Sequence, residues 1–250
     1  MTNRTLTTLD LGDCKIGGAG CVGLSQGLAI NSSLVAICLA DNMARDQTSV
    51  AETCLAENTM GDKGAMAMGT ALKTNRTLKT LDLARCGISG NGCAALCDSL
   101  CEAAHTVALS ELSLDNGVAF RCPGSFSEKT NTLNGAQAVR RMLTAVTSLT
   151  NLRLKNFLDG ETACANLCEG IANNSSLLEL DLRGVHLNNK EGIQDEAKDA
   201  IIKALASNTS GIKIFNDFGL QRGPAHGRVA SQVQEDLPRC IEHTVTKTGW

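Results

Sequence analysis

The chain has 250 residues, of which 43% are hydrophobic and 20% are charged, and this composition excludes intrinsic disorder. Aromatic residues make up only 2%, so leucine, alanine and cysteine must fill the interior. The net charge of -3 provides no overall field that would attract nucleic acid or an anionic membrane. No segment approaches the roughly 20 apolar residues of a membrane span, and the N-terminus lacks a secretory pattern, so we expect a protein of the reducing cytoplasm.

Internal repeats organise the chain from its first residues. Residues 3–24 (NRTLTTLDLGDCKIGGAGCVGL) and 75–96 (NRTLKTLDLARCGISGNGCAAL) are identical at 14 of 22 positions. The pattern L-x-x-L-x-L occurs in six copies, at Leu6, Leu9 and Leu11; Leu34, Ile37 and Leu39; Leu78, Leu81 and Leu83; Leu109, Leu112 and Leu114; Leu149, Leu152 and Leu154; and Leu177, Leu180 and Leu182. A weaker copy spans residues 50–58 (VAETCLAEN), and a degenerate one lies near Ile212 and Ile214. Such a period predicts a stacked array.

Each repeat predicts one short strand followed by one helix. The two leucines of L-x-L lie on one face of a strand, and the residue between them faces the other way. Apolar residues at helical spacing follow, such as Cys93, Leu96 and Leu100. Because no single unit can bury its own apolar face, neighbouring units must stack to make the core.

The spacing of about 28 residues resembles the ribonuclease-inhibitor class of leucine-rich repeats, and is similar to the repeats of Ran GTPase-activating protein and of NOD-like receptors. The resemblance implies an α/β horseshoe with a concave parallel sheet and outer helices over residues 1–215, and a C-terminal tail or cap over 216–250. It also implies partner binding on the concave sheet or its rim. The Ran activator has a long acidic tail, which this sequence lacks.

Departures from the period identify segments that could be specific to this protein. Met1 leads straight into the first repeat without a polar capping unit, so we expect a neighbouring protein, or more of the same polypeptide, to cover the N-terminal edge. Residues 42–50 leave no room for a helix and predict a strand with a short return, which would leave a gap in the outer helix layer. Residues 117–133 (GVAFRCPGSFSEKTNTL) predict an insertion loop containing Phe120, Arg121, Cys122 and Phe126. This loop is either a binding finger with apolar tips or an insertion whose phenylalanines pack back on the array. The segment after 216 either caps the last repeat or reaches a partner.

Two short motifs suggest enzymes, but their positions in the repeat favour a structural role. Gly18, Gly20 and Gly23 satisfy G-x-G-x-x-G but begin seven residues after Leu11, where the repeat turns into its helix. The sequence GLSQG around Ser25 matches the nucleophile elbow, but its register places it inside that helix. We expect neither a catalytic site nor a cofactor.

Cysteine and asparagine recur for reasons that the repeat explains. The sequence has 12 cysteines; we interpret them as buried free thiols rather than as metal ligands or disulfides, with Cys122 the reactive exception. N-x-[ST] sequons start at one position of the repeat at Asn3, Asn31, Asn75, Asn174 and Asn208, and a sixth, overlapping one starts at Asn173. Their constant place in the repeat favours helix ends in the left-handed conformation over glycosylation.

The register predicts which residues the concave face presents. The strand centres are Asp10, Cys38, Cys54, Asp82, Ser113, Arg153 and Asp181, and the next column is Gly12, Ala40, Ala56, Ala84, Asp115, Lys155 and Arg183. The later half, with Glu111 and Glu179, forms a mixed-charge patch that suits a protein surface, or else a solvated sheet with internal ion pairs. We predict a non-enzymatic interaction module, a scaffold or complex subunit, that binds protein through Arg153, Lys155, Arg183, Asp181, Glu179, Asp115, Glu111, Phe120, Arg121 and Phe126. The alternative is a GTPase-activating regulator resembling the Ran activator, which GTP turnover assays would reveal.

Overall fold

Short strands and helices alternate along the chain in the computed structural model, which describes residues 3–42, 60–115, 126–155, 161–183 and 194–215. The strands are β1 (Thr8–Asp10), β2 (Ala36–Cys38), β3 (Thr80–Asp82), β4 (Glu111–Ser113), β5 (Asn151–Arg153), β6 (Glu179–Asp181) and β7 (Lys213–Phe215). The helices are α1 (Gly18–Ile30), α2 (Gly61–Leu72), α3 (Gly90–Glu102), α4 (Phe126–Ala145), α5 (Glu161–Asn173) and α6 (Gln194–Ser207). None of these helices is both long enough and apolar enough to cross a membrane.

The strands form one parallel sheet whose order is the order of the chain. The middle leucine of each repeat pairs with the middle leucine of the next, as in Leu9 with Ile37 and Ile37 with Leu81. The same register continues to Ile214 at the far end. The predicted stacking of phased repeats, including the degenerate last copy, is therefore confirmed.

Because β2 pairs directly with β3, the weaker copy at residues 50–58, which lies outside the described residues, does not supply a strand between them. Its prediction as a separate strand-only unit is wrong, and Cys54 and Ala56 do not belong to the strand columns between β2 and β3. The physical reason is visible in the sequence, since Thr53 stands at the buried middle position that is Ile37 in the preceding copy. The expected gap in the helix layer is absent too: α1 packs against α2.

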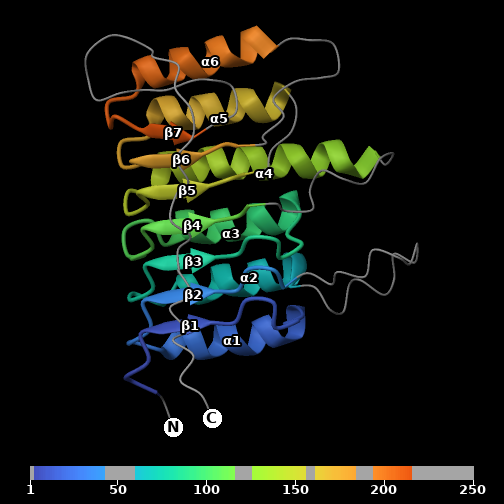
Figure 1. Cartoon of the computed structure of the whole chain (residues 1–250), viewed down its shortest axis with the longest axis vertical. Coiled ribbons are helices and arrows are strands. Elements are labelled where there is room, and N and C mark those ends of the chain that lie inside the picture. Colours follow the sequence, from blue (N-terminus) through green and yellow to red (C-terminus); the bar gives the residue numbers. More distant parts are fainter. Residues whose placement is uncertain (1–2, 43–59, 116–125, 156–160, 184–193, 216–250) are drawn as a thin grey trace, which may run out of the picture.

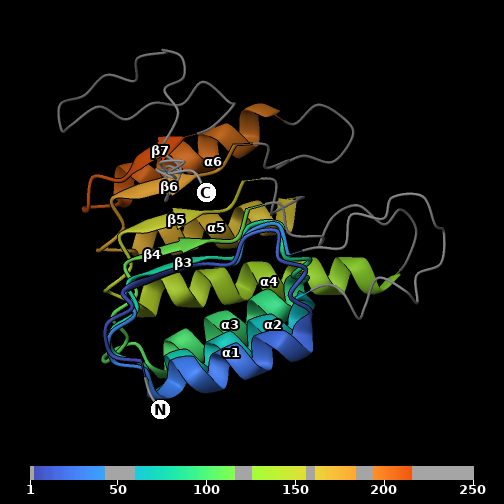
Figure 2. The same cartoon turned by 60° about the horizontal axis from the view of Figure 1, so that its bottom comes forward.

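The six helices of the described part of the chain lie on one side of the sheet, and none of them covers the other side (Figures 1 and 2). From β2 onward the strand leucines pack on the helix side and are almost completely buried, as Leu81 and Leu83 are at 1% exposure each. Neighbouring strands are about 4.8 Å apart and packed helices about 8–10 Å apart, so an array of such units must curve with its sheet on the inner side. The inner side is called the concave face below.

Small residues allow neighbouring helices to approach closely. A Cβ atom added to Gly69 of α2 would lie 2.9 Å from Ser99 Cβ of α3, and one added to Gly135 of α4 would lie 3.0 Å from Gly90 Cα. Asp62 of α2 also accepts hydrogen bonds from the backbone nitrogen and hydroxyl of Ser89, 2.7 and 2.6 Å long, at the start of α3. The helix layer therefore depends on glycine at defined crossings.

The predicted insertion loop at 117–133 is partly wrong, because α4 begins at Phe126 and residues 126–133 belong to its first turns. From Ser125 to Asn134 the sequence has neither proline nor glycine to stop a helix. Residues 117–125, with Phe120 and Arg121, lie outside the described residues, as does the segment 216–250.

The repeated asparagines form a ladder between repeats. Asn75 donates from its side chain to the carbonyls of Leu28 and Asn31, at 2.9 and 3.0 Å, and its oxygen accepts from the backbone nitrogens of Thr77 and Leu78. Asn208 repeats this arrangement on Ile171 and Asn174. The expected left-handed conformation is wrong, since none of these asparagines has a positive φ and the Asn31 backbone is extended. A helix-ending role is nevertheless correct, because the side chain itself satisfies the carbonyls of the preceding helix.

Candidate protein-binding face

The concave face is built from the residues between the strand leucines and those two positions further on. Strand pairing places Asp82, Ser113, Arg153 and Asp181 opposite one another across β3–β6. The sequence predicted this column correctly because the two-residue period of a strand fixes which side chains share a face. The structure adds Phe215 at the end of the column, where it pairs with Asp181.

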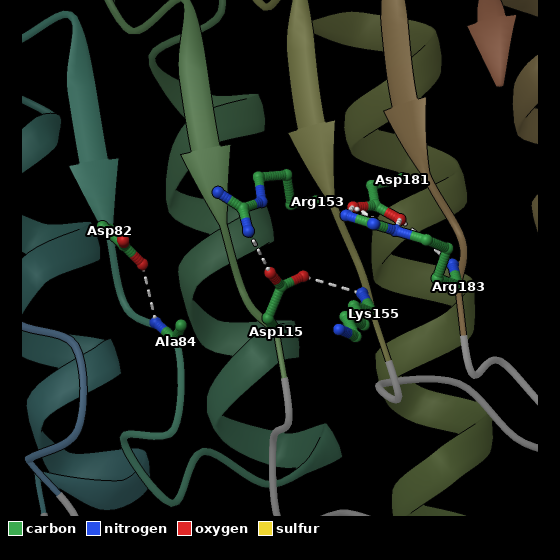
Figure 3. Close-up of polar contacts among 7 residues, drawn as sticks. All are labelled: Asp82, Ala84, Asp115, Arg153, Lys155, Asp181 and Arg183. Atoms are coloured by element: carbon green, nitrogen blue, oxygen red, sulfur yellow. Dashed lines mark hydrogen bonds and ion pairs between the residues drawn. The ribbon is translucent and has the colours of Figure 1, made fainter. Parts of the chain in front are cut away.

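Asp115 and Arg153 form the centre of a polar cluster on this face (Figure 3). A guanidinium nitrogen of Arg153 lies 3.0 Å from Asp115 Oδ2, and the backbone nitrogen of Lys155 donates to Asp115 Oδ1 at 2.7 Å. The Asp115 side chain is only 4% exposed, whereas that of Arg153 is 23% exposed. Burial raises the pKa of Asp115 above its ordinary value, and this effect outweighs the opposing influence of Arg153 and of the Lys155 amide.

Arg183 makes a second ion pair on the next strand by folding back over Asp181 (Figure 3). Its Nη2 lies 2.7 Å from Asp181 Oδ2, its Nε lies 3.0 Å from Oδ1, and its backbone nitrogen donates to the same Oδ1. The Asp181 side chain is fully buried and that of Arg183 is 20% exposed. In both ion pairs the carboxylate is buried, and the guanidinium group lies nearer the solvent.

The two predicted glutamates flank this cluster and bond to neighbouring strands. Glu111 accepts from the Thr80 hydroxyl at 3.4 Å, and Glu179 accepts from the Asn151 amide at 3.1 Å. The structure thus brings together seven of the ten predicted site residues, which are Glu111, Asp115, Arg153, Lys155, Glu179, Asp181 and Arg183. Phe120 and Arg121 lie outside the described residues, and Phe126 is placed only as the first residue of α4.

The aspartates at strand centres have a structural task that the sequence reasoning missed. Asp10, Asp82 and Asp181 each accept a hydrogen bond from the backbone nitrogen two residues later, as Asp82 does from Ala84 at 3.0 Å (Figure 3). This bond stabilises the turn at the end of the strand. The repeated sequence L-D-L was the available signal.

Phe215 and Lys213 were missed because the last repeat is degenerate and its sequence leaves the frame open. Ile212 and Ile214 suggest an L-x-L pair with Lys213 at its centre, but Ile214 pairs with Leu180, the middle leucine of its repeat. Phe215 is therefore the strand centre. Lys213 Nζ lies 4.5 Å from the centroid of its ring, within the range of a cation–π interaction.

The edge of the sheet at β1 is apolar and exposed, as the sequence predicted. Leu6 is 43% exposed, whereas Leu78, its counterpart in the nearly identical repeat, is 1% exposed. Leu9 and Leu11 are only partly buried against the core. Among the described residues, the repeat of β2 precedes Leu78 and packs on it, and no repeat of the described part contacts Leu6 from the other side.

The two motifs that resemble enzyme signatures, G-x-G-x-x-G and GLSQG, both lie within α1. Gly18, Gly20 and Gly23 lie within α1, and the Ser25 hydroxyl of the same helix is buried and donates to the Cys21 carbonyl at 2.7 Å. A serine in such a bond is not presented as a nucleophile.

The nine cysteines in the described part of the chain are all free thiols, but the prediction that every cysteine except Cys122 is buried is wrong for Cys14. Burial raises the pKa of Cys21 to about 11 and that of Cys38 to about 12, which makes both poor nucleophiles at neutral pH. Cys14 is exposed. Cys122, which the sequence singled out as reactive, lies outside the described residues. No group of three or more His, Cys, Asp or Glu residues that could hold a metal ion occurs among the residues described.

One parallel strand and one outer helix per repeat, in chain order and on an L-x-x-L-x-L core, define a leucine-rich-repeat solenoid. A family model described as Leucine Rich repeat matches residues 2–25 and 74–97, the two most similar repeats. The chain is a leucine-rich-repeat protein of the ribonuclease-inhibitor-like type.

Two relatives each cover 71% of the chain at 30% identity. They are human NACHT, LRR and PYD domains-containing protein 14, aligned over 184 residues, and ribonuclease inhibitor of Sus scrofa, aligned over 208 residues. The mouse NACHT, LRR and PYD domains-containing protein 14 is 32% identical over 111 residues, or 39% of the chain. The matches span 11% to 45% of the length of these relatives. The solved structure of Leiomodin-1 Actin-Binding Site 2 aligns with 83% of each chain at 14% identity and a TM-score of 0.40, which is too low to bear on function.

Proposed function

We propose that the chain is a non-catalytic protein-interaction module, a scaffold or a subunit of a larger assembly, whose partner lies on the concave face over β4–β7. The observation that carries the proposal is the polar cluster on this face, in which buried carboxylates hold guanidinium groups near the solvent. Arginine is enriched among the residues that dominate protein interfaces, and holding its side chain in place before binding lowers the entropy cost of binding. The porcine relative is named for inhibiting a ribonuclease, which is an act of binding another protein.

The seven clustered residues have different tasks in this proposal. Arg153, Lys155 and Arg183 contact the partner, and Asp115 and Asp181 hold the two guanidiniums in place. Glu111 and Glu179 contribute polar contacts at the side of the cluster. Phe120 and Arg121, which precede α4 in the sequence, and Phe126, its first residue, remain proposed contacts.

A second contact of the proposed assembly lies at the β1 edge. Leu6 and the half-buried Leu9 and Leu11 form an apolar surface there, and the same residues of the sister repeat are buried by a neighbour. We expect a neighbouring protein surface to cover this edge, because exposed apolar strand edges are sites of association.

The concave contact can be tested with one bulky substitution on each side of the solenoid. Asn151→Trp places an indole in the middle of the proposed site on β5, and Met66→Trp places one on α2, where Met66 is 56% exposed. Proteins retained from a native extract by each variant and by the wild type are compared by mass spectrometry. Partners that the wild type retains should be lost with Asn151→Trp and kept with Met66→Trp, and partners lost only with Met66→Trp would place binding on the helices.

The charged pairs themselves make less suitable test sites. Reversing the charge of Arg153 or Arg183 would leave the buried Asp115 or Asp181 without its cation and beside a new carboxylate. Breaking a buried pair in this way destabilises proteins by about 3–5 kcal/mol, so lost binding would be confused with lost folding. Lys155 uses its backbone nitrogen in the cluster, so its side chain can be changed without removing that bond.

A further inference from the structure

Charge is distributed unevenly along the concave face. On β1–β3 the strand positions and the residues two further on include the carboxylates Asp10 and Asp82 and no basic residue. On β5–β7 the described residues at the same positions include four basic ones, which are Arg153, Lys155, Arg183 and Lys213, and two acidic ones, Glu179 and Asp181. The corresponding position after β7 is Asp217, which lies outside the described residues. The face is therefore negative at its N-terminal end and positive at its C-terminal end.

Burial strengthens this asymmetry. Asp181 is fully buried and Asp115 is nearly so, whereas their arginine partners are 20% and 23% exposed. A partner over β5–β7 would meet the cations first. At the other end, Asp10 is exposed and Asp82 is half-buried. Neither carboxylate forms an ion pair within the described part of the chain, so their charges are not offset there.

Phe215 adds an apolar contact at the positive end. Its ring is half-buried at the end of the strand-centre column, next to Asp181, with Lys213 Nζ 4.5 Å from its centroid. Cations beside an aromatic ring complement a carboxylate followed by an apolar side chain.

We infer that the concave face binds an acidic, extended segment of its protein partner over β5–β7, and that the carboxylates on β1–β3 fix the direction in which the partner docks. This inference rests on the proposed function and adds the chemistry and orientation of the partner. Like charges placed opposite one another disfavour the reversed arrangement. Because the two halves are separated by only a few strands, their charges can act on one segment.

Binding of a defined acidic peptide to the full chain tests the inference. The probe is a fluorescein-labelled dodecapeptide of alternating glutamate and alanine that ends in leucine, and its counterpart has lysine in place of glutamate. Fluorescence anisotropy is measured for the wild type, for Lys155→Glu and for Lys79→Glu, a matched control with the same charge change at an exposed residue beside β3. Thermal melting confirms that each variant is folded.

We expect the acidic peptide to bind, with affinity at least fivefold lower for Lys155→Glu and less than twofold lower for Lys79→Glu. Absence of acidic-peptide binding, equal losses in the two variants, or tighter binding of the lysine peptide at a site sensitive to Lys155→Glu would each overturn the inference. Failure of the proposed function looks different, because Asn151→Trp would then retain every partner captured by the wild type. Partners lost with Asn151→Trp but insensitive to Lys155→Glu would leave the proposed function standing and contradict the inference.

Discussion

Arg153 of β5 and Asp115, two residues beyond the end of the neighbouring β4, form an ion pair on the concave face, with 3.0 Å between a guanidinium nitrogen and a carboxylate oxygen. The carboxylate is nearly buried and the guanidinium is partly exposed, so the pair presents a cation to the solvent. Since burial raises the pKa of Asp115, ionising this carboxyl group in the folded state costs free energy even with Arg153 beside it.

The pH dependence of stability should report this cost. A carboxyl group whose pKa is higher in the folded than in the unfolded state loses stability as pH rises from its unfolded pKa, about 4, through its folded pKa. In Asp115→Asn this titration is absent, while the amide oxygen can still accept from the Lys155 nitrogen. The free energy of unfolding of the wild type minus that of the variant should therefore fall as pH increases from 3 to 7, as measured by urea denaturation. A difference that rises with pH would show that Arg153 outweighs burial.

The asparagine ladder predicts very different effects at two adjacent residues. Asn174 is buried, donates to the Leu143 carbonyl at 2.7 Å and accepts from the backbone nitrogens of Ser176 and Leu177. Asn174→Ala should lower the free energy of unfolding by about 2–4 kcal/mol, because buried backbone groups lose their partners. Asn173 is exposed and bonds only within its own helix, to the Glu169 carbonyl. Asn173→Ala should change stability by less than about 0.5 kcal/mol, and equal effects in chemical denaturation would refute the ladder's role.

Close helix packing predicts opposite effects for two glycine-to-alanine changes. Gly69→Ala would place a methyl group 2.9 Å from Ser99 Cβ and 3.2 Å from Leu96 Cα, so α2 and α3 must separate. We expect a loss of about 1–3 kcal/mol. Gly27 in α1 has open space at the same position, and Gly27→Ala should stabilise the chain by about 0.5–1 kcal/mol through helix propensity. Thermal and urea denaturation measure the change in stability of each variant. Equal changes in the two variants would show that α2 and α3 do not pack closely at Gly69.

The exposed β1 edge predicts that the isolated chain associates or is only marginally stable. Leu6 carries the largest exposure among the first leucines of the repeats, with 43% against 5% for Leu34 and 1% for Leu78. Light scattering and thermal melting of the isolated chain test this expectation, and Leu6→Ser should reduce association by removing apolar surface. A stable monomer in both measurements would show that the edge needs no cover.

The sequence predicted most of the fold because the fold follows from two short periods. Leucines spaced as Leu78, Leu81 and Leu83 determine both the strand and the side of it that is buried, and the phase between repeats determines which strands are neighbours. The prediction failed where a segment resembles the repeat motif but lacks one of its buried aliphatic residues. Residues 50–58 resemble a repeat but have Thr53 in place of a buried aliphatic residue.

The candidate site was only partly predictable for a different reason. The register placed Arg153 and Asp115 on one face, but it does not determine which carboxylates are buried beneath the guanidinium groups that they pair with. That outcome depends on the packing of long side chains across strands about 40 residues apart in sequence. Phe215 was missed because the sequence of the degenerate last repeat can be aligned with the other repeats in two ways. Only the strand pairing shows which alignment is correct.

Site-specific photocrosslinking tests the location of the partner most directly. A benzophenone amino acid is introduced at Asn151 on the concave face in one variant and at Met66 on the outer helix layer in another. After irradiation in native extract, we predict a crosslinked partner protein from position 151 and none from position 66. A partner crosslinked from position 66 but not from position 151 would contradict binding on the concave face.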